Sequence, residues 1–168
     1  PLHEQALIET LSEINDEKSI RIFYEKMDLL IGKASIDPDQ IHSSVRADNR
    51  IQVTLGRRYV IMLKRKADTI RWSMILNSSD EELAINHPNY DRSGFFDDSD
   101  GKQTYCWAEF NFPLKETDLK FGELWDKWLV AASTYYNEIK GTRLVDIYRR
   151  AINYAVVKSF FEIDYRNS

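Results

Sequence analysis

The sequence predicts an α+β fold: an antiparallel sheet of about four or more strands, flanked by N-terminal and C-terminal helices that pack mainly on one face. Residues 4–32 have the apolar spacing of helices, residues 51–76 alternate as half-buried strands do, and residues 118–140 return to the helical spacing. Helices placed before and after a run of strands are typical of this class. The 168 residues, of which 43% are hydrophobic, fit a single domain covering residues 1–168.

Two helices are expected before the sheet. Residues 4–14 place their apolar side chains on one helical face. A second helix begins near Asn15 and Asp16, because Asn is a good cap and acids are stabilised at the positive end of the helix dipole. It ends at about Gly32, since glycine is a natural helix terminator. Residues 36–49 are polar and contain a proline, which predicts a connection.

An antiparallel meander of three strands is expected next, over residues 51–55, 59–63 and 70–76. The first and third alternate apolar with polar residues, and the middle one is apolar on both faces, which suits a central strand. Gly56-Arg57 forms a turn or a bulge, and residues 64–69 form the next turn.

A short helix capped by Ser78 follows the meander, and residues 86–102 are expected to form a long polar loop. Residues 105–112 return as a strand, which Pro113 ends.

Two helices close the chain in this prediction. The first covers residues 118–140 and has a buried apolar stripe. Gly141 breaks it, and Thr142 caps a last helix that carries apolar residues as far as Phe160.

The composition indicates the cellular compartment in which the protein is expected. A single cysteine, Cys106, excludes an intrachain disulfide and favours a reducing, cytoplasmic location. Cys106 falls on the apolar side of its strand, where an inert buried thiol is expected. No apolar run reaches the roughly 18–20 residues of a membrane span, so no membrane partner is expected. The chain begins at Pro1 without a methionine, which indicates a domain excised from a larger protein.

The most unusual feature is a basic window in an acidic chain. Residues 46–71 contain eight Lys or Arg and two Asp, a net charge of +6 in a chain of net charge −4. Because the window coincides with predicted strands, the charge is displayed on a sheet surface, which favours a polyanion such as DNA. Lysine and arginine contact phosphates, and tryptophan stacks on bases. The candidate DNA-binding residues are therefore Arg57, Arg58, Lys64, Arg65, Arg71 and Trp72.

The basic window also has two interpretations that do not involve DNA. Charged turns keep sheet edges soluble and prevent strand addition. Alternatively, the chain is a protein-interaction or oligomerisation domain, in which the basic sheet of one copy meets residues 77–126 of another copy or of a partner subunit. Those residues carry four bases and twelve acids, a net charge of −8.

A metal-dependent nuclease is the third function considered. Glu109 lies on a predicted strand, but Asn111 stands where such a nuclease would need a lysine. The acidic loop at residues 97–101 fails the spacing of a calcium loop at both ends. The chain has no nucleophile elbow, phosphate-binding glycine loop or dinucleotide motif. We therefore assign no catalytic residue, metal ligand or cofactor.

Two stretches of the chain carry a resemblance. They are Gly56-Arg57-Arg58-Tyr59-Val60-Ile61, and the run Arg149-Arg150-Ala151-Ile152-Asn153-Tyr154-Ala155 that leads to Asp164-Tyr165-Arg166. Both resemble accessory α+β domains beside the AAA+ GTPase of McrBC-type, modification-dependent restriction systems. The resemblance implies a non-enzymatic DNA-recognition module of a bacterial restriction or antiviral defence protein, with DNA, including modified DNA, as its partner. The motor and the nuclease would then lie in other domains or subunits.

Overall fold

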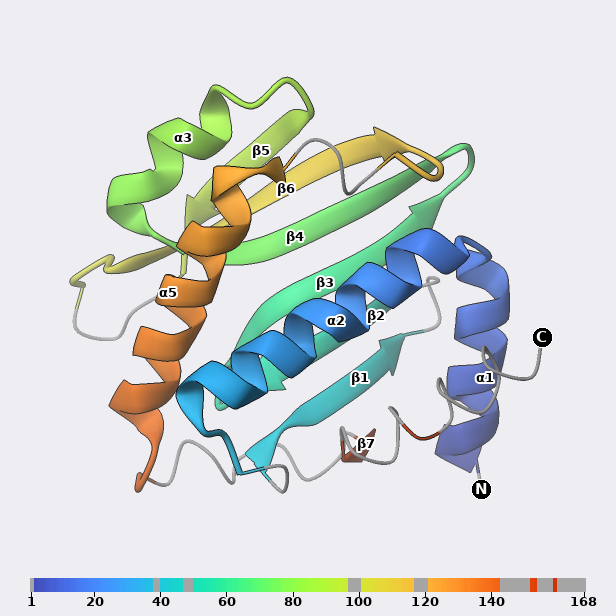
Figure 1. Cartoon of the computed structure of the whole chain (residues 1–168), viewed down its shortest axis with the longest axis horizontal. Coiled ribbons are helices and arrows are strands. Elements are labelled where there is room, and N and C mark those ends of the chain that lie inside the picture. The colour runs from blue at the N-terminus through green and yellow to red at the C-terminus, as the bar shows by residue number, and fades with distance from the viewer. Residues whose placement is uncertain are drawn as a thin grey trace.

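The computed structural model describes residues 2–37, 40–46, 50–96, 101–116, 121–142, 152–153 and 159. Within these residues, seven strands form one antiparallel sheet in the order β5-β6-β4-β3-β2-β1-β7 (Figure 1). The strands are β1 (His42–Arg46), β2 (Arg50–Leu55), β3 (Arg58–Lys66), β4 (Thr69–Asn77), β5 (Tyr90–Phe95), β6 (Tyr105–Pro113) and β7 (Ile152–Asn153). The helices are α1 (Leu2–Ile14), α2 (Glu17–Ala34), α3 (Glu81–Ile85) and α5 (Glu123–Ile139), with a 3-10 turn, η2 (Ser78–Asp80), before α3. The predicted α+β class is confirmed.

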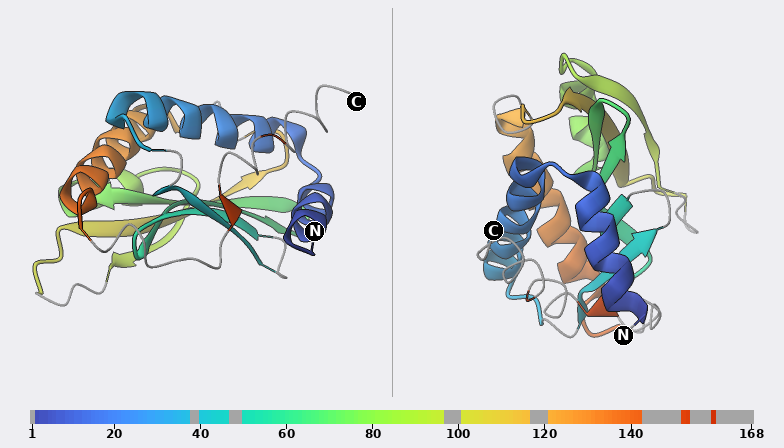
Figure 2. Two further views of the ribbon diagram at one scale, coloured as in Figure 1. Left: turned by 90° about the horizontal axis from the view of Figure 1, so that it is seen from below. Right: turned by 90° about the vertical axis from the view of Figure 1, so that its right-hand side faces the viewer.

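The helices lie on one side of the sheet. α2 and α5 cross one face, and α1 stands at one end of the sheet (Figure 2). α3 joins the same layer beside β5, where the hydroxyl of Ser93 donates to Glu81 at 3.0 Å. In the described part of the chain, no helix covers the opposite face (Figure 2). We call this opposite face, which carries Arg50, Lys64, Arg71 and Glu109, the open face.

The core lies between the sheet and the helices and is rich in aromatic rings. Trp72 of β4 is fully buried, and its ring centroid lies 6.2 Å from that of Phe23 in α2 and 5.5 Å from that of Trp125 in α5. Phe121 meets Trp72 and Trp125 edge-on at 6.1 and 4.8 Å. Edge-to-face contacts of this kind stabilise a core beyond the area that they bury. They fix which face of β4 points to the helices.

Both ends of α2 have the local structure of helix caps. Asp16 is its N-cap, with an extended backbone (φ −132°) and a carboxylate that accepts a hydrogen bond from the amide of Ser19 at 3.3 Å. The helix continues past Gly32 to Ala34, and Ser35 ends it in the left-handed conformation (φ 51°). The expected stop at Gly32 was therefore early by two residues.

The pairing of β2 with β3 contains a bulge at Val60. Val53 pairs with Ile61 and Thr54 pairs with Tyr59, so the register skips Val60. The pairing of β3 with β4 begins only at Ile61. An extra residue of this kind leaves its backbone groups outside the ladder. The hairpin turn itself lies at Gly56-Arg57, as predicted, and Gly56 has the positive φ of 61° that glycine readily adopts.

Two segments expected to be irregular are strands. β1 lies within the predicted connection at residues 36–49, and β5 lies within the predicted loop at residues 86–102. β5 pairs only with β6, and β1 pairs with β2 and the two-residue β7. Strands at or near a sheet edge form through backbone hydrogen bonds and need no alternating apolar pattern, which explains why both predictions were wrong.

The prediction of a last helix is wrong for two of its residues, which form a strand instead. Ile152 and Asn153 form β7 and pair antiparallel with Ser43 and His42. The remainder of that prediction, including most of the second stretch that carries the resemblance, lies outside the described residues.

Candidate nucleic-acid interface

The six predicted binding residues do not form one cluster. Arg58 and Arg65 are seven positions apart on β3, which corresponds to about 23 Å at a rise of about 3.3 Å per residue. Strand pleating also sends alternate side chains to opposite faces. The structure therefore separates Arg57, Arg58, Arg65 and Trp72 from the pair Lys64 and Arg71.

Trp72 is not available for base stacking. Its exposed fraction is 0%, and its ring is enclosed by Phe23, Phe121 and Trp125 on the helix side. The prediction that it stacks on a base is wrong, because Trp72 shares a strand face with the buried Ile70 and Met74.

Arg65 is a structural residue on the helix side of the sheet. Its Nη1 donates to the carbonyl oxygen of Ile14, the last residue of α1, at 2.8 Å. Its Nε donates to the carbonyl oxygen of Ala67 at 2.8 Å. A cation at a helix C-terminus satisfies a carbonyl that lacks a helical partner and complements the helix dipole. The structure thus gives Arg65 a role in joining α1 to the sheet.

Arg58 is held by aromatic rings at the far end of β3. Its guanidinium carbon lies 5.3 Å from the ring centroids of Phe96 and Tyr105, and 5.1 Å from that of Tyr135. The hydroxyl of Tyr105 donates to Glu138 at 2.7 Å. Burial raises the pKa of Tyr105 and of Tyr135, so both phenols stay neutral at physiological pH. Arg57, the next residue, is exposed in the turn.

Lys64 and Arg71 do come together, and a third cation joins them. Arg50 on β2 pairs with Lys64 on β3, and Lys64 pairs with Arg71 on β4. Because Trp72 points to the helices, its neighbour Arg71 points to the open face, and directly paired residues share a face. We call the row Arg50, Lys64 and Arg71 the cationic row. In the backbone register, Arg50 also pairs with Arg46 of β1.

Such a row opposes the stability of the sheet. Directly opposed residues on neighbouring antiparallel strands have Cβ atoms about 5 Å apart, and like charges at this spacing are destabilising. Arg50 and Lys64 are both partly exposed. The row therefore brings three cationic side chains together on neighbouring strands of the open face.

Carboxylates flank one end of the row. Arg71 forms ion pairs with Asp91 at 2.7 Å and with Glu109 at 3.2 Å, and its Nε donates to the side-chain oxygen of Asn111. Glu109 also accepts from Arg92 Nε at 2.9 Å. The side chain of Glu109 is only 8% exposed, whereas that of Arg92 is 62% exposed. On the open face, the ion pairs of Arg71 and Arg92 therefore connect β4, β5 and β6.

The nuclease arrangement does not appear at Glu109. Its two carboxylate oxygens face the guanidinium groups of Arg71 and Arg92, an environment unsuited to a bound cation. Among the described residues, no three His, Cys, Asp or Glu side chains gather as a metal site would require. Burial raises the pKa of Cys106 to about 12, so this thiol is protonated and unreactive at neutral pH.

The phenol of Tyr59 lies on the open face, near Ser73, Glu109 and Arg50. Burial, together with the nearby carboxylate of Glu109, raises the pKa of Tyr59 well above its usual range. Its ring meets that of Phe96 edge-on at 5.7 Å. This phenol is neutral and does not offset the charge of the cationic row.

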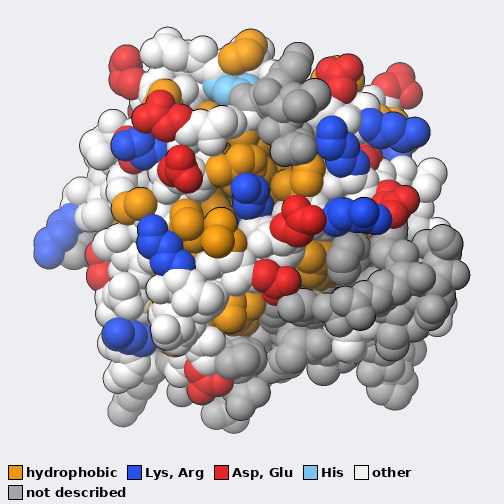
Figure 3. All heavy atoms as spheres, viewed as in Figure 1, with side chains coloured by type: hydrophobic (Ala, Val, Ile, Leu, Met, Phe, Trp, Pro, Cys, Tyr) orange, Lys and Arg blue, Asp and Glu red, His pale blue; other side chains and the backbone are white. Residues whose placement is uncertain are grey.

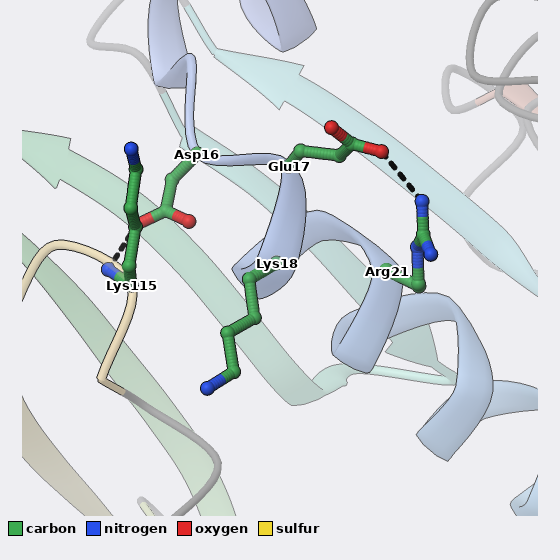
Figure 4. Close-up of a pocket in the computed structure, with 5 residues that line it drawn as sticks. All are labelled: Asp16, Glu17, Lys18, Arg21 and Lys115. Carbon is green, nitrogen blue, oxygen red and sulfur yellow. Dashed lines mark hydrogen bonds and ion pairs between the residues drawn. The ribbon is translucent and has the colours of Figure 1, made fainter.

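The described residues of the helix side show no comparable concentration of charge. Acidic and basic side chains are interspersed over it, and hydrophobic side chains reach the surface near its centre (Figure 3). A pocket of about 380 Å³ lies at the start of α2, lined by Asp16, Glu17, Lys18, Arg21 and Lys115 (Figure 4). The carboxylate of Asp16 is occupied by the amides of Ser19 and Lys115, and Arg21 pairs with Glu17. These contacts cap the helix and give no sign of a ligand.

The prediction missed Arg50 and Arg92 as residues of this face. Arg50 lies inside the basic window, but only the strand register shows that it neighbours Lys64. Arg92 lies in the segment expected to be a loop, so no sequence signal placed it on a sheet.

None of the described helices is long and apolar enough to cross a membrane. No protein-family model matches the chain, and no curated protein matches its sequence.

Proposed function

We propose that this chain is a non-enzymatic DNA-recognition module that binds DNA through the open face of its sheet. The cationic row carries the proposal, because Arg50, Lys64 and Arg71 lie in register on three neighbouring strands. Lysine and arginine that neutralise phosphates release counterions, which supplies most of the salt-dependent affinity for DNA. The arrangement across strands gives the site a fixed shape, unlike a basic tail.

The proposed setting is a larger bacterial restriction or defence protein in the cytoplasm. The resemblance to accessory domains of McrBC-type systems supports this setting, and the single cysteine supports the location. A non-enzymatic module also fits a chain whose single cysteine is held as a neutral thiol and whose Glu109 is paired with Arg71 and Arg92.

A fluorescence-anisotropy titration tests the proposal. Single-stranded, duplex and methylated duplex DNA would be titrated at about 50 mM and about 200 mM salt. The variant Arg50→Gln with Lys64→Gln should bind at least roughly tenfold more weakly and show a salt dependence reduced by about two phosphate contacts. The matched control, Lys33→Gln with Lys140→Gln, removes two exposed cations from the helix layer and should bind like the unmodified chain.

Equal affinity of both double variants would contradict the proposal. Light scattering in the same salt series would then test self-association without DNA. Salt-sensitive self-association that the Arg50 and Lys64 changes abolish would assign the cationic row to a protein contact.

A further inference from the structure

The open face is wider than the major groove of duplex DNA. Neighbouring strands lie about 4.8 Å apart. The five adjacent strands in the sheet order β2-β3-β4-β6-β5 therefore span about 19 Å. The major groove of duplex DNA is about 12 Å wide. The edge of an unpaired base can turn toward a broad sheet face, as in sheet domains that read single strands.

One exposed side chain on this face is held in a fixed orientation. The Nε of Arg92 donates to Glu109 at 2.9 Å, and the guanidinium carbon lies 5.6 Å from the ring centroid of Trp107. The side chain is nevertheless 62% exposed. A guanidinium has five N–H donors, so the Glu109 bond uses one of them. The outer edge of the group is presented to the surface in an orientation set by two neighbours.

The two neighbours are themselves fixed. Glu109 is nearly buried and also pairs with Arg71 at 3.2 Å. Trp107 pairs with Gly94 of β5 across the sheet, and a Cβ at Gly94 would lie 2.7 Å from Cζ2 of the indole. The absence of a side chain at Gly94 therefore allows the indole to lie across β5. Glu109, Trp107 and Gly94 act together to position Arg92.

This environment suits a neutral acceptor better than a phosphate. The buried carboxylate balances part of the positive charge of Arg92 and so weakens its general attraction for anions. The directional donors of the outer edge stay intact. The commonest pairing for such a pair of donors is the O6 and N7 edge of guanine.

We propose that Arg92 reads the O6 and N7 edge of an unpaired guanine, while the cationic row holds the neighbouring phosphates. Glu109, Trp107 and Gly94 are positioning residues for Arg92. The proposal rests on the function proposed above, since it requires that nucleic acid binds the open face.

Binding of two single-stranded oligonucleotides tests the assignment. One contains guanine, and the other has 7-deazaguanine at the same positions and lacks only the N7 acceptor. The unmodified chain should prefer guanine roughly tenfold. Arg92→Lys keeps the charge but loses the forked donors, so it should bind both probes equally. Arg21→Lys, on an ion-paired arginine of α2 that is 56% exposed, is the matched control and should keep the preference.

A second variant separates positioning from folding. Gly94→Ala should displace Trp107 and abolish the guanine preference, while the affinity for the 7-deazaguanine probe and its salt dependence stay unchanged. Unchanged affinity for that probe also shows that the variant is folded. Weakened binding of both probes by Gly94→Ala, or a preference that survives Arg92→Lys, would overturn the assignment.

The two proposals fail in different ways. If the unmodified chain binds both probes equally, and the Arg50 and Lys64 changes still weaken binding, Arg92 is not a base reader but the open face binds DNA. If neither single-stranded probe binds, the assignment of Arg92 fails, and the duplex titrations described above decide whether the open face binds DNA.

Discussion

The indole Nε1 of Trp128 in α5 donates a hydrogen bond of 2.8 Å to the carbonyl oxygen of Val60, the bulged residue of β3. Trp128 is fully buried, and so is Val60. The bulge leaves the backbone of Val60 outside the ladder, and the indole supplies a partner from the helix layer. One hydrogen bond thus connects an irregularity of the sheet pairing to the helix that packs over it.

Trp128→Phe should therefore destabilise the protein. The change leaves the buried Val60 carbonyl without its hydrogen-bond donor, which lowers the free energy of unfolding by about 1–3 kcal/mol. The smaller phenyl ring also reduces the packing in the core. Urea unfolding followed by circular dichroism would measure the loss. Trp125→Phe is the control, because within the described residues Trp125 Nε1 has no hydrogen-bond acceptor. Equal losses in the two variants would show that ring volume, and not the hydrogen bond, accounts for the effect.

Replacing Arg65 should affect stability and not DNA binding. Arg65→Ala removes two hydrogen bonds to backbone carbonyls, including that of Ile14 at the end of α1. We expect a loss of about 1–2 kcal/mol in urea unfolding. Arg57→Ala, in the exposed turn, should change stability by less than about 0.5 kcal/mol. A stable Arg65→Ala protein that fails to bind DNA would return Arg65 to the interface.

Removing the charge of Glu109 should cost more than removing that of Asp91. Glu109→Gln leaves the guanidinium of Arg71, only 12% exposed, without its buried partner, and we expect a loss of roughly 3 kcal/mol. Asp91 is 38% exposed, so solvent screens its pair with Arg71, and Asp91→Asn should cost less than about 1 kcal/mol. Chemical denaturation of both variants gives the comparison. A larger loss of stability for Asp91→Asn would show that the ion pair of Arg71 with Asp91 stabilises the protein more than its ion pair with Glu109.

The stability of the protein should fall at alkaline pH, partly because of Cys106. Burial raises the pKa of this thiol from 9.0 to about 12 in the folded protein. The stabilisation of the neutral thiol is complete below pH 9 and is lost as the pH rises toward the folded pKa. Cys106→Ala should therefore lose less stability than the unmodified chain between neutral pH and the alkaline range, measured by urea unfolding. Some loss should remain, because the buried tyrosines shift in the same direction. Identical pH profiles for the two proteins would contradict this assignment.

Sequence periodicity was sufficient for the centre of the sheet and insufficient for its edges. β2, β3 and β4 have apolar residues in alternation or in a continuous run, because the helices bury one of their faces and the central strands are also buried at several positions of the other face. β1 and β5 are polar segments held by backbone pairing, which leaves no periodic signal.

The charge pattern of the sequence was not sufficient to predict which residues share the candidate site. Trp72 and Arg71 are adjacent in the sequence, but pleating places them on opposite faces. The apolar neighbours Ile70 and Met74 already indicated the buried side, and the basic window obscured this signal. The pairing of Lys64 with Arg71 follows from the short turn between β3 and β4. That of Arg50 with Lys64 depends on the bulge and could not be counted from the Gly56-Arg57 turn.

The bulge at Val60 determines which side chains of β2 and β3 lie on the same face of the sheet. If β2 and β3 paired regularly from their turn, Arg50 would lie opposite Leu63 instead of Lys64, and each face would mix cations with aliphatic side chains. The additional residue advances the phase of β3 by one position, so that Ile51 and Val53 meet Leu63 and Ile61 on the side of the helices. A single buried residue thus separates the polar from the apolar side chains of two strands, and the separation of the cationic row from the core originates in the backbone.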